Sequence, residues 1–205
     1  MKNKKQILVG KKIGMTQVLL DTGEAVPVTV IKAYENAIIR LRTIDKDGYN
    51  AVCVGYGFSK KSRLTKPHKG QFKSGEIYRN IKEFRVGSLD GFELNSKVDT
   101  SSFEVNLKYN LQSKTIGRGF TGAIKAWNHQ RGPMSHGSKN HRLLGSIGQA
   151  TTPGRVMKGK KMHTRYGNET VTIKNLTLIK IDGDHLFFKG AVPGKNNTVF
   201  VSGVN

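Results

Sequence analysis

The stretch VTIKNLTLIKIDGDHLFFKGAV, from Val171 to Val192, carries the local pattern that decides the fold. It consists of two runs rich in β-branched and aromatic residues, separated by the turn signal Asp182-Gly183-Asp184. Such runs, with many positions alternating between apolar and polar, are typical of β-strands, and an Asp-Gly turn between two of them is typical of a β-hairpin. The stretch therefore predicts two antiparallel strands joined by a tight turn.

Similar runs occur in the first part of the chain and at its C-terminal end, and they read QILVG, TQVLL, PVTVIKAY, AIIRLRTI, YNAVCVGY and TVFVS. Further turn signals fall between runs of this kind, at Asp21-Thr22-Gly23, Asp47-Gly48 and Asp90-Gly91. Many short strands with regular turns favour an antiparallel barrel or sandwich. We therefore expect a mainly β fold, with an antiparallel β-barrel built from residues 1–110 and 168–205.

A basic stretch interrupts the expected strands between Ser59 and Gly75. It reads SKKSRLTKPHKGQFKSG and contains six cations and no acid. Its glycines, serines and proline are typical of loops rather than of strands. We expect a basic loop or short helix near residues 59–80, on the same domain as the barrel.

The overall charge indicates a polyanionic partner. The 205 residues include 35 Lys and Arg against 14 Asp and Glu, which gives a formal net charge of +21 and an isoelectric point near 10.2. This excess of positive charge is unusual for a metabolic enzyme, and it favours nucleic acid as the partner. The basic N-terminal start precedes an apolar run too short for a signal peptide, so we expect a soluble protein with no export signal and no membrane segment.

The single cysteine, Cys53, narrows the class further. One cysteine excludes an intramolecular disulfide framework and a cysteine-rich zinc site, and it fits a reducing compartment. Free cysteine usually behaves as a small buried hydrophobe, so we expect Cys53 in the core.

The positive charge is concentrated in one internal segment. Between Glu104 and Glu169 lie 64 residues without an acid, and they hold 12 of the 35 cations. The rest of the chain holds the other 23 cations and all 14 acids, the mixed-sign surface of an ordinary domain. We therefore expect a long irregular basic extension at residues 111–167, inserted into the barrel domain.

The length and composition of this extension suit folded RNA. The residues from Asn128 to Tyr166, running out and back, can reach on the order of 60 to 70 Å at about 3.3 to 3.6 Å per residue. Lys and Arg neutralise phosphates, glycines let the backbone approach closely, and polar side chains hydrogen-bond to sugar and base. For Trp127 two roles stay open, a packing residue at the root of the extension or a stacking platform for a base.

Nucleotide-cofactor motifs are incomplete. Residues Gly117 to Gly122 match the G-x-G-x-x-G fingerprint, but that site needs an acid about 20 residues on to bind ribose, and none occurs before Glu169. The kinase triplets H-R-D and D-F-G are absent from the sequence. We expect no cofactor.

The histidines do not form a convincing metal or catalytic site. His129, His136 and His141 have no carboxylate or thiolate nearby, and the surrounding cations disfavour a divalent metal. Two function classes remain, a structural RNA-binding protein and a nucleic-acid enzyme or regulator with a basic specificity loop. The lack of acids in the segment favours the first, since hydrolysis of nucleic acid usually needs carboxylates or a positioned base. We expect no catalytic residue and no bound metal.

Several long motifs then carry a family resemblance. VGKKIGMTQV (Val9–Val18), GRGFTGAIKAWN (Gly117–Asn128), RGPMSHGSKNHR (Arg131–Arg142), GSIGQATTPGRVMKGKKM (Gly145–Met162) and KGAVPG (Lys189–Gly194) occur in that order. Together they resemble ribosomal protein L-three of the large subunit, in its bacterial or organellar form. The resemblance spans nearly the whole chain.

The resemblance implies a fold and a role. It implies a barrel similar to those of translation factors, at the ribosome surface, and an extension that passes through large-subunit (23S-type) rRNA toward the peptidyl-transferase centre. It also implies a part in early subunit assembly, neighbouring large-subunit proteins as partners, and no enzymatic activity. The expected location is a cytoplasmic ribosome, or a plastid or other organellar one.

On this resemblance we expect one set of rRNA-binding residues and one modification site. In some family members the glutamine of the GSIGQ motif is N5-methylated, so Gln149 is the candidate substrate of a glutamine methyltransferase. The expected rRNA-binding residues are Lys11, Lys12, Lys60, Lys61, Arg63, Lys66, Lys69, Arg118, Lys125, Trp127, Asn128, His129, Arg131, His136, Lys139, Asn140, His141, Arg142, Gln149, Arg155, Lys158, Lys160, Lys161 and Arg165.

Overall fold

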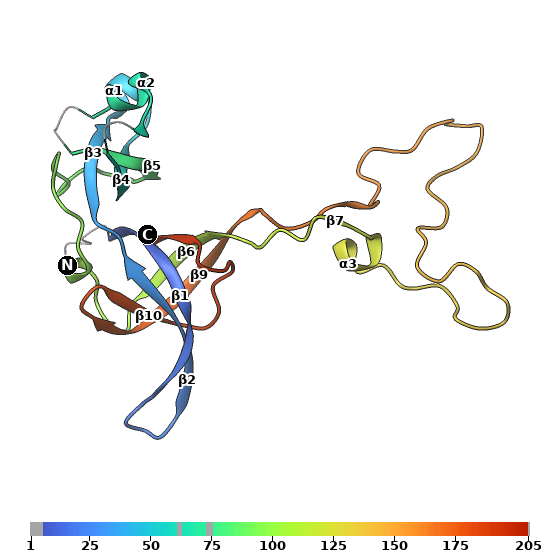
Figure 1. Cartoon of the computed structure of the whole chain (residues 1–205). Coiled ribbons are helices and arrows are strands. Elements are labelled where there is room, and N and C mark those ends of the chain that lie inside the picture. The colour runs from blue at the N-terminus through green and yellow to red at the C-terminus, as the bar shows by residue number, and fades with distance from the viewer. Residues whose placement is uncertain (1–5, 61–62, 73–75, 205) are drawn as a thin grey trace. The chain divides into compact units, whose positions relative to one another are not determined.

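The computed structural model describes residues 6–60, 63–72 and 76–204 (Figure 1). The chain divides into two compact units, one made of the residues up to 114 and from 170 onward, the other of residues 115–169. We call them unit 1 and unit 2 and describe each by itself. No helix in the described residues is long and apolar enough to cross a membrane.

Six strands of unit 1 form a closed antiparallel ring. In order around the ring they are β1 (Ile7–Leu19), β11 (Thr198–Gly203), β6 (Lys108–Lys114), β9 (Thr170–Asp182), β10 (His185–Lys189) and β2 (Ala25–Ala33), which pairs with β1 again. Every one of these pairings is antiparallel. Because each strand has a neighbour on both sides, the ring exposes no long unpaired edge where the six strands meet. The expectation of a mainly β, antiparallel fold is confirmed.

The stretch from Val171 to Val192 folds as its pattern predicts. Strands β9 and β10 pair from His185 opposite Asp182, so only Gly183 and Asp184 make the turn. Gly183 has a positive φ of 53°, a conformation that most side chains disfavour, and this explains the glycine at the turn.

A second, three-stranded sheet in unit 1 consists of β3 (Asn36–Arg42), β4 (Ala51–Phe58) and β5 (Tyr78–Arg85). Two short helices lie beside its strands in the sequence, α1 (Ile44–Asp47) and α2 (Lys66–Lys69). The stretch expected to be a basic loop or short helix thus includes α2, while β5 begins within its last residues.

Two turn signals differ from the simple hairpin turns that we expected. Asp47 ends helix α1, and Gly48 caps that helix with a φ of 80°, because a left-handed residue closes a helix C-terminus. Asp90-Gly91 lies in the long connection between β5 and β6, which also contains the short 3₁₀ helix η2 (Thr100–Ser102). The chain bends or turns at the Asp-Gly pair in both places, but the pair does not by itself say which elements it connects.

The alternation along β1 separates two hydrophobic cores. Leu8 is fully buried inside the ring with Tyr109, Leu111, Leu178 and Phe188. Its neighbours Ile7 and Val9 belong to another cluster, with residues of the three-stranded sheet such as Ile38, Val52, Val54 and Phe84. Successive side chains of a strand point to opposite faces, so one strand serves both cores.

The connection between β10 and β11 is held by polar side chains from three ring strands. Thr29 Oγ1 donates to the carbonyl of Gly190 at 2.6 Å, and Ser113 Oγ donates to the carbonyl of Pro193 at 2.8 Å. The ammonium of Lys12 donates to the carbonyl of Val192, and burial lowers the pKa of this lysine. Buried polar groups need such partners, so these bonds fix the path of the connection.

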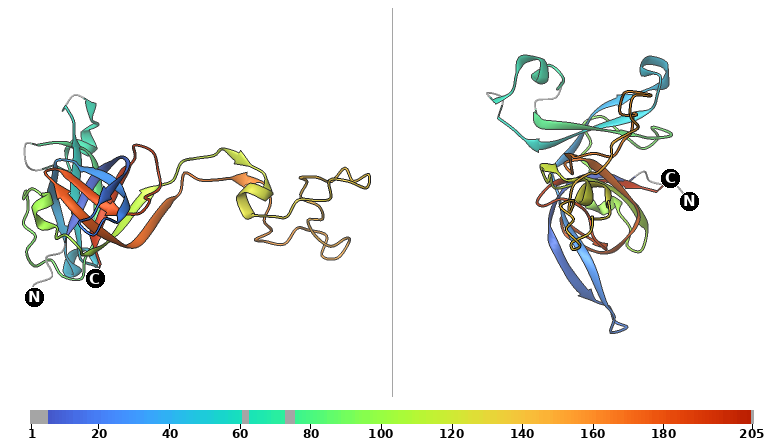
Figure 2. Two further views of the ribbon diagram at one scale, coloured as in Figure 1. Left: turned by 90° about the horizontal axis from the view of Figure 1, so that it is seen from below. Right: turned by 90° about the vertical axis from the view of Figure 1, so that its right-hand side faces the viewer.

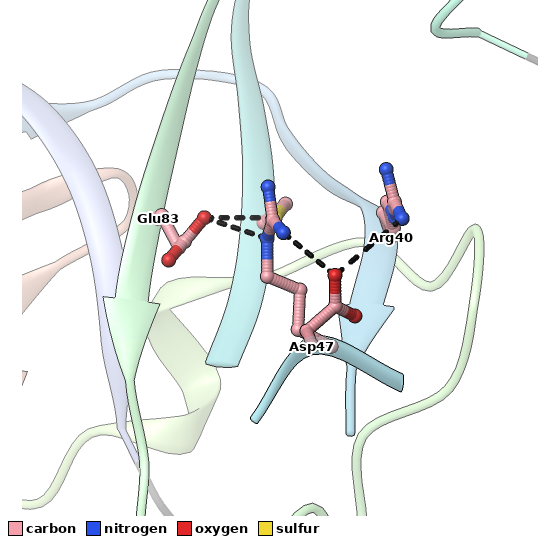
Figure 3. A network of polar contacts seen from close by, with 5 residues as sticks. Arg40, Asp47 and Glu83 are labelled. Atoms are coloured by element: carbon pink, nitrogen blue, oxygen red, sulfur yellow. Dashed lines mark hydrogen bonds and ion pairs between the residues drawn. The ribbon is translucent and has the colours of Figure 1, made fainter. Parts of the chain in front are cut away.

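Cys53 is buried in the three-stranded sheet, as expected, and burial raises the pKa of its thiol. Its sulfur lies 3.8 Å from Glu83 Oε2, beside a network of ion pairs (Figure 3). In this network Arg42 Nη1 lies 2.8 Å from Asp47 Oδ1, Arg42 Nε lies 2.8 Å from Glu83 Oε2, and Arg40 lies 3.8 Å from Asp47. Arg40 and Arg42 of β3 are therefore paired with acids of the same unit.

Unit 1 should fold without unit 2. Lys114 of β6 and Thr170 of β9 are paired directly across the ladder, about 4.5 to 5.5 Å apart between Cα atoms. A chain in which residues 115–169 are replaced by Asn-Gly can close this gap with a two-residue turn. We expect it to keep its β-rich circular dichroism spectrum and a cooperative thermal transition. Loss of that transition would make unit 2 part of the folding core.

A variant that should destabilise unit 1, and so serves as a control for the folding test, is Leu111→Ala. Leu111 is fully buried in the ring, and removal of such a side chain costs about 2 to 5 kcal/mol. We expect this variant to lower the free energy of unfolding in urea by that amount, both in the full chain and in the shortened chain.

Candidate nucleic-acid interface

The two arms of unit 2 run antiparallel near the point where it joins the rest of the chain. Thr115 N–H donates to the carbonyl of Glu169 at 2.9 Å, and Glu169 N–H donates to the Thr115 hydroxyl at 3.1 Å. Farther along, Tyr166 accepts from Arg118 N–H at 2.8 Å and donates its own N–H to Gly119 at 3.0 Å. Strands β7 (Phe120–Thr121) and β8 (Thr164–Arg165) continue the pairing. The arms are therefore a ribbon rather than a pair of free loops.

A glycine allows the two arms of unit 2 to lie this close together. A Cβ on Gly167 would lie 2.2 Å from the carbonyl oxygen of Ile116 in the opposite arm, and Gly167 has a φ of 78°. Both the crowding and the left-handed backbone exclude a side chain at this position.

Beyond the ribbon, helix α3 (Ala123–Trp127) presents Trp127. The helix ends at Asn128, whose φ of 59° is the left-handed conformation of a C-cap. The indole Nε1 of Trp127 donates to the carbonyl of Met162 at 2.7 Å, and Lys161 Nζ lies 5.7 Å from the ring centroid. The side chain is nevertheless 41% exposed. Trp127 thus joins the two arms through its nitrogen and keeps part of its ring free for a stacking contact.

The loop from Arg131 to Arg142 is closed by a backbone contact. Gly132 N–H donates to the carbonyl of His141 at 3.0 Å, and His141 Nδ1 lies 2.9 Å from the carbonyl oxygen of Pro133. A Cβ on Gly132 would lie 1.8 Å from the carbonyl oxygen of Asn140, so only glycine fits there. His141 therefore holds the loop in shape, whereas His136 is exposed.

The next loop surrounds an open hollow of about 450 Å³. Gln149 and Arg155 line it together with Ile147, Val156 and several glycines. The side chains of Gln149 and Arg155 are both exposed. The hollow thus combines a cation, an amide and apolar groups, the chemistry that a nucleotide can contact with its phosphate, its base edge and its base face.

None of the ion pairs found in the described residues involves a cation of unit 2. Residues 115–169 contain ten Lys and Arg and one acid, Glu169, at the end of the segment. All ten cations are exposed. The ion pairs found in the described residues join Arg40, Arg42 and Lys180 to acids of unit 1. Unit 2 therefore presents a net charge of +9 on extended loops, an arrangement that external anions must balance.

The structure divides the expected rRNA-binding residues between the two units. Residues from Arg118 to Arg165 lie in unit 2, and within this set only His129 and His141 are half-buried. Of the residues in unit 1, Lys11, Lys60, Arg63 and Lys66 are exposed, and Lys69 is half-buried at the end of α2. Lys12 hydrogen-bonds within unit 1, and Lys61 lies outside the described residues.

Aromatic residues of unit 2 lie beside one of its arginines and one of its histidines, and the set of binding residues expected from the sequence does not include them. Arg118 lies over the ring of Tyr166, 5.1 Å from its centroid, and the Phe120 ring lies 6.3 Å from that of His163. Phe120 is 77% exposed. Aromatic residues interleaved with cations are a recognised signal of nucleic-acid binding, and the sequence of the segment contains this signal.

No group of His, Cys, Asp or Glu in the described residues could hold a metal.

Comparison with known proteins decides the family. The sequence model of the family described as Ribosomal protein L3 matches residues 88–191. The chain is 46% identical over 196 residues to large ribosomal subunit protein uL3 of Prochlorococcus marinus (strain MIT 9312), an alignment that covers 94% of this chain and 90% of the relative. The chain belongs to the ribosomal protein L3 family.

A second relative agrees with this assignment. Large ribosomal subunit protein uL3 of Synechococcus sp. (strain CC9902) is 47% identical over 192 residues, which cover 92% of this chain and 88% of the relative. As a member of the L3 family, the chain is a ribosomal protein of the large subunit and not an enzyme. The expectation drawn from the motifs is confirmed.

The closed loop of this L3 family member can be tested at Gly132. In Gly132→Ala the added Cβ must displace the Asn140 carbonyl, which opens the loop. We expect tryptic cleavage after Lys139 to rise by about tenfold, since proteolysis follows the population of the open form. In the control Gly148→Ala the nearest atom to the Cβ is 3.6 Å away and φ is not positive, so cleavage should not change. Equal rates in the two variants would contradict the closed loop.

Proposed function

We propose that the chain is a structural constituent of the large ribosomal subunit in which unit 2 is an extension that binds large-subunit rRNA. The observation that carries the proposal is the set of ten exposed cations, with one acid at the edge of the segment and, in the part of the chain that the structure describes, no ion pair to any of them. Phosphates are the groups that such a surface attracts, and displacement of their counterions supplies much of the binding free energy.

The loop geometry supports folded RNA in particular. Unit 2 is narrow enough at Gly132 and Gly167 that backbone lies directly against backbone. Its exposed groups include the rings of Phe120 and Trp127 and the amide of Gln149 beside the open hollow. Such a segment fits into crevices and stacks on unpaired bases, the modes by which proteins commonly recognise RNA.

Unit 1 has a separate role in this proposal. Its ring of six strands is the barrel domain, similar to the barrels of translation factors, and lies at the surface of the subunit. Its exposed cations Lys11, Lys60, Arg63 and Lys66 add contacts to rRNA. Lys12 contributes mainly to the fold, because its ammonium is bound to the carbonyl of Val192. Binding of this chain occurs early in subunit assembly, and unit 2 extends toward the peptidyl-transferase centre.

Gln149 is the modification site in this proposal. Its side chain is exposed at the rim of the hollow, where a glutamine methyltransferase can reach the amide before rRNA covers it. The ribosome concerned is a bacterial cytoplasmic ribosome or a plastid one, and relatives from Prochlorococcus and Synechococcus fit both.

The salt dependence of binding tests the role of the cations. The slope of log K against log salt becomes shallower by about 0.7 to 0.9 for each phosphate that the protein ceases to neutralise. We expect the variant with Arg155, Lys158, Lys160 and Lys161 all changed to Gln to have a slope shallower by about 3. The measurement is a titration of the full chain with its rRNA site at several salt concentrations.

The matched control changes the net charge equally within unit 1. Lys174, Lys180, Lys189 and Lys195 are exposed lysines of β9, β10 and the connection after β10. Their change to Gln should leave most of the slope intact. If the slope becomes equally shallow in both variants, binding depends on net charge alone and unit 2 has no special part in it.

Incorporation into the subunit tests the proposal in the cell. The chain with residues 115–169 replaced by Asn-Gly should fold but should be absent from large subunits on a sucrose gradient. Stable incorporation of this shortened chain would contradict an anchoring role for unit 2. A full chain that is absent from large subunits but acts alone on RNA would contradict the proposal as a whole.

A further inference from the structure

The outer part of the β1–β2 hairpin of unit 1 has a charge opposite in sign to that of the chain. Between Lys12 and Lys32 the sequence has no Lys, Arg or His, and this is the longest stretch of the chain without Lys or Arg. Its only charged residues are Asp21 and Glu24, so the segment 13–31 carries −2 in a protein that carries +21, while Lys11, Lys12 and Lys32 lie at the base of the hairpin. Such a segment does not suit a polyanionic partner.

The outer part of this hairpin is a two-stranded ribbon. β1 pairs with β11 only from Ile7 to Lys11, and β2 pairs with β10 only from Val28 to Lys32. Beyond these points, residues 17–19 pair only with residues 25–27, whereas residues 14–16 pair with residues 28–30, which also pair with β10. Figure 1 shows the hairpin in blue, running past the ring, and Figure 2 shows it from two further directions.

One face of the ribbon is apolar and exposed. Met15 is 50% exposed and Leu19 is 72% exposed, and both lie on the same face of β1 because alternate residues of a strand share a face. Opposite Leu19 lies Ala25, and opposite Gln17 lies Pro27, both exposed. Ile13, at the irregularity in the β1–β2 pairing, is a further 51% exposed apolar residue. Exposed large apolar side chains gathered on one hairpin, here Met15 and Leu19 on either side of Gln17, are typical of a contact surface.

The charges decide which kind of partner fits this surface. RNA is disfavoured, because the two acids at the tip repel phosphates and no Lys, Arg or His occurs between Lys12 and Lys32 to offset them. A second copy of the hairpin is disfavoured for the same reason, since the acidic tips would meet. A protein with an apolar patch bordered by Lys or Arg complements both features.

We propose that the β1–β2 hairpin is a protein-docking surface for a basic neighbouring protein of the large subunit. The partner packs apolar side chains on Met15 and Leu19, and its cations pair with Asp21 and Glu24. This inference goes beyond the proposed function, because it assigns a separate surface to protein rather than to rRNA.

Photo-crosslinking in assembled subunits tests the occupant. Met15 and Leu19 are replaced, one at a time, by a diazirine analogue of leucine in the full chain, and the crosslinked species are identified by mass spectrometry. We expect crosslinks from both positions to one ribosomal protein, on a peptide with apolar residues and Lys or Arg. Crosslinks to rRNA or to a second copy of this chain, or no crosslink at all, would overturn the proposal.

The same diazirine label at Phe120 tests the proposed rRNA binding independently of the docking surface. Phe120 is 77% exposed in unit 2 and should crosslink to rRNA. If Phe120 crosslinks to RNA and the hairpin positions do not crosslink to protein, the docking surface fails while the rRNA extension stands.

A charge-reversal pair tests the predicted complementarity. Asp21→Lys with Glu24→Lys should lower the crosslink yield from Leu19 by about tenfold, because like charges then face each other. The control is Asp182→Lys with Asp184→Lys, which reverses two exposed acids at the β9–β10 turn. This control should leave the yield unchanged. Equal yields from the two double variants would overturn the claim that the partner is basic.

Discussion

The uncompensated positive charge of residues 115–169 is the constraint on which the rest of the molecule depends. Ten exposed cations and a single acid cannot form a core, and their repulsion opposes a compact free structure. Unit 2 keeps its shape through a few local contacts, such as the hydrogen bond from Trp127 to Met162 and the close approach of Gly132 to Asn140. These contacts set the path of the chain and leave its charges to an external polyanion.

Unit 1 is stabilised in a different way from unit 2. It contains nearly all the acids, and its arginines Arg40 and Arg42 pair with Asp47 and Glu83. Its strand β1 supplies Leu8 to the core of the ring and Ile7 and Val9 to the second core, so this one strand packs into both hydrophobic cores. Burial of apolar surface therefore folds unit 1, while charge determines what unit 2 binds.

The sequence predicts the strands well, because alternation and Asp-Gly turns are local signals. The β9–β10 hairpin follows directly from its pattern. The sequence could not predict that Lys12 is held by Val192 or that the indole of Trp127 reaches Met162, because these contacts join residues far apart in the chain. It also missed that Asp47 ends a helix, since an Asp-Gly pair suits a turn and a helix end equally. For the candidate interface, the distribution of charged residues in the sequence identified the cations but not the aromatic residues Phe120 and Tyr166.

The central claim is that rRNA covers the loops of unit 2 in the large subunit, and amide hydrogen exchange measures this directly. The amides of residues 128–166 make few backbone hydrogen bonds within the chain, so they should exchange rapidly in the free protein. In large subunits the same amides should be protected by at least about a hundredfold, and digestion of the rRNA should abolish that protection. Amides of the ring should exchange slowly in both states. Equal protection of residues 128–166 in the free chain and in the subunit would contradict the account.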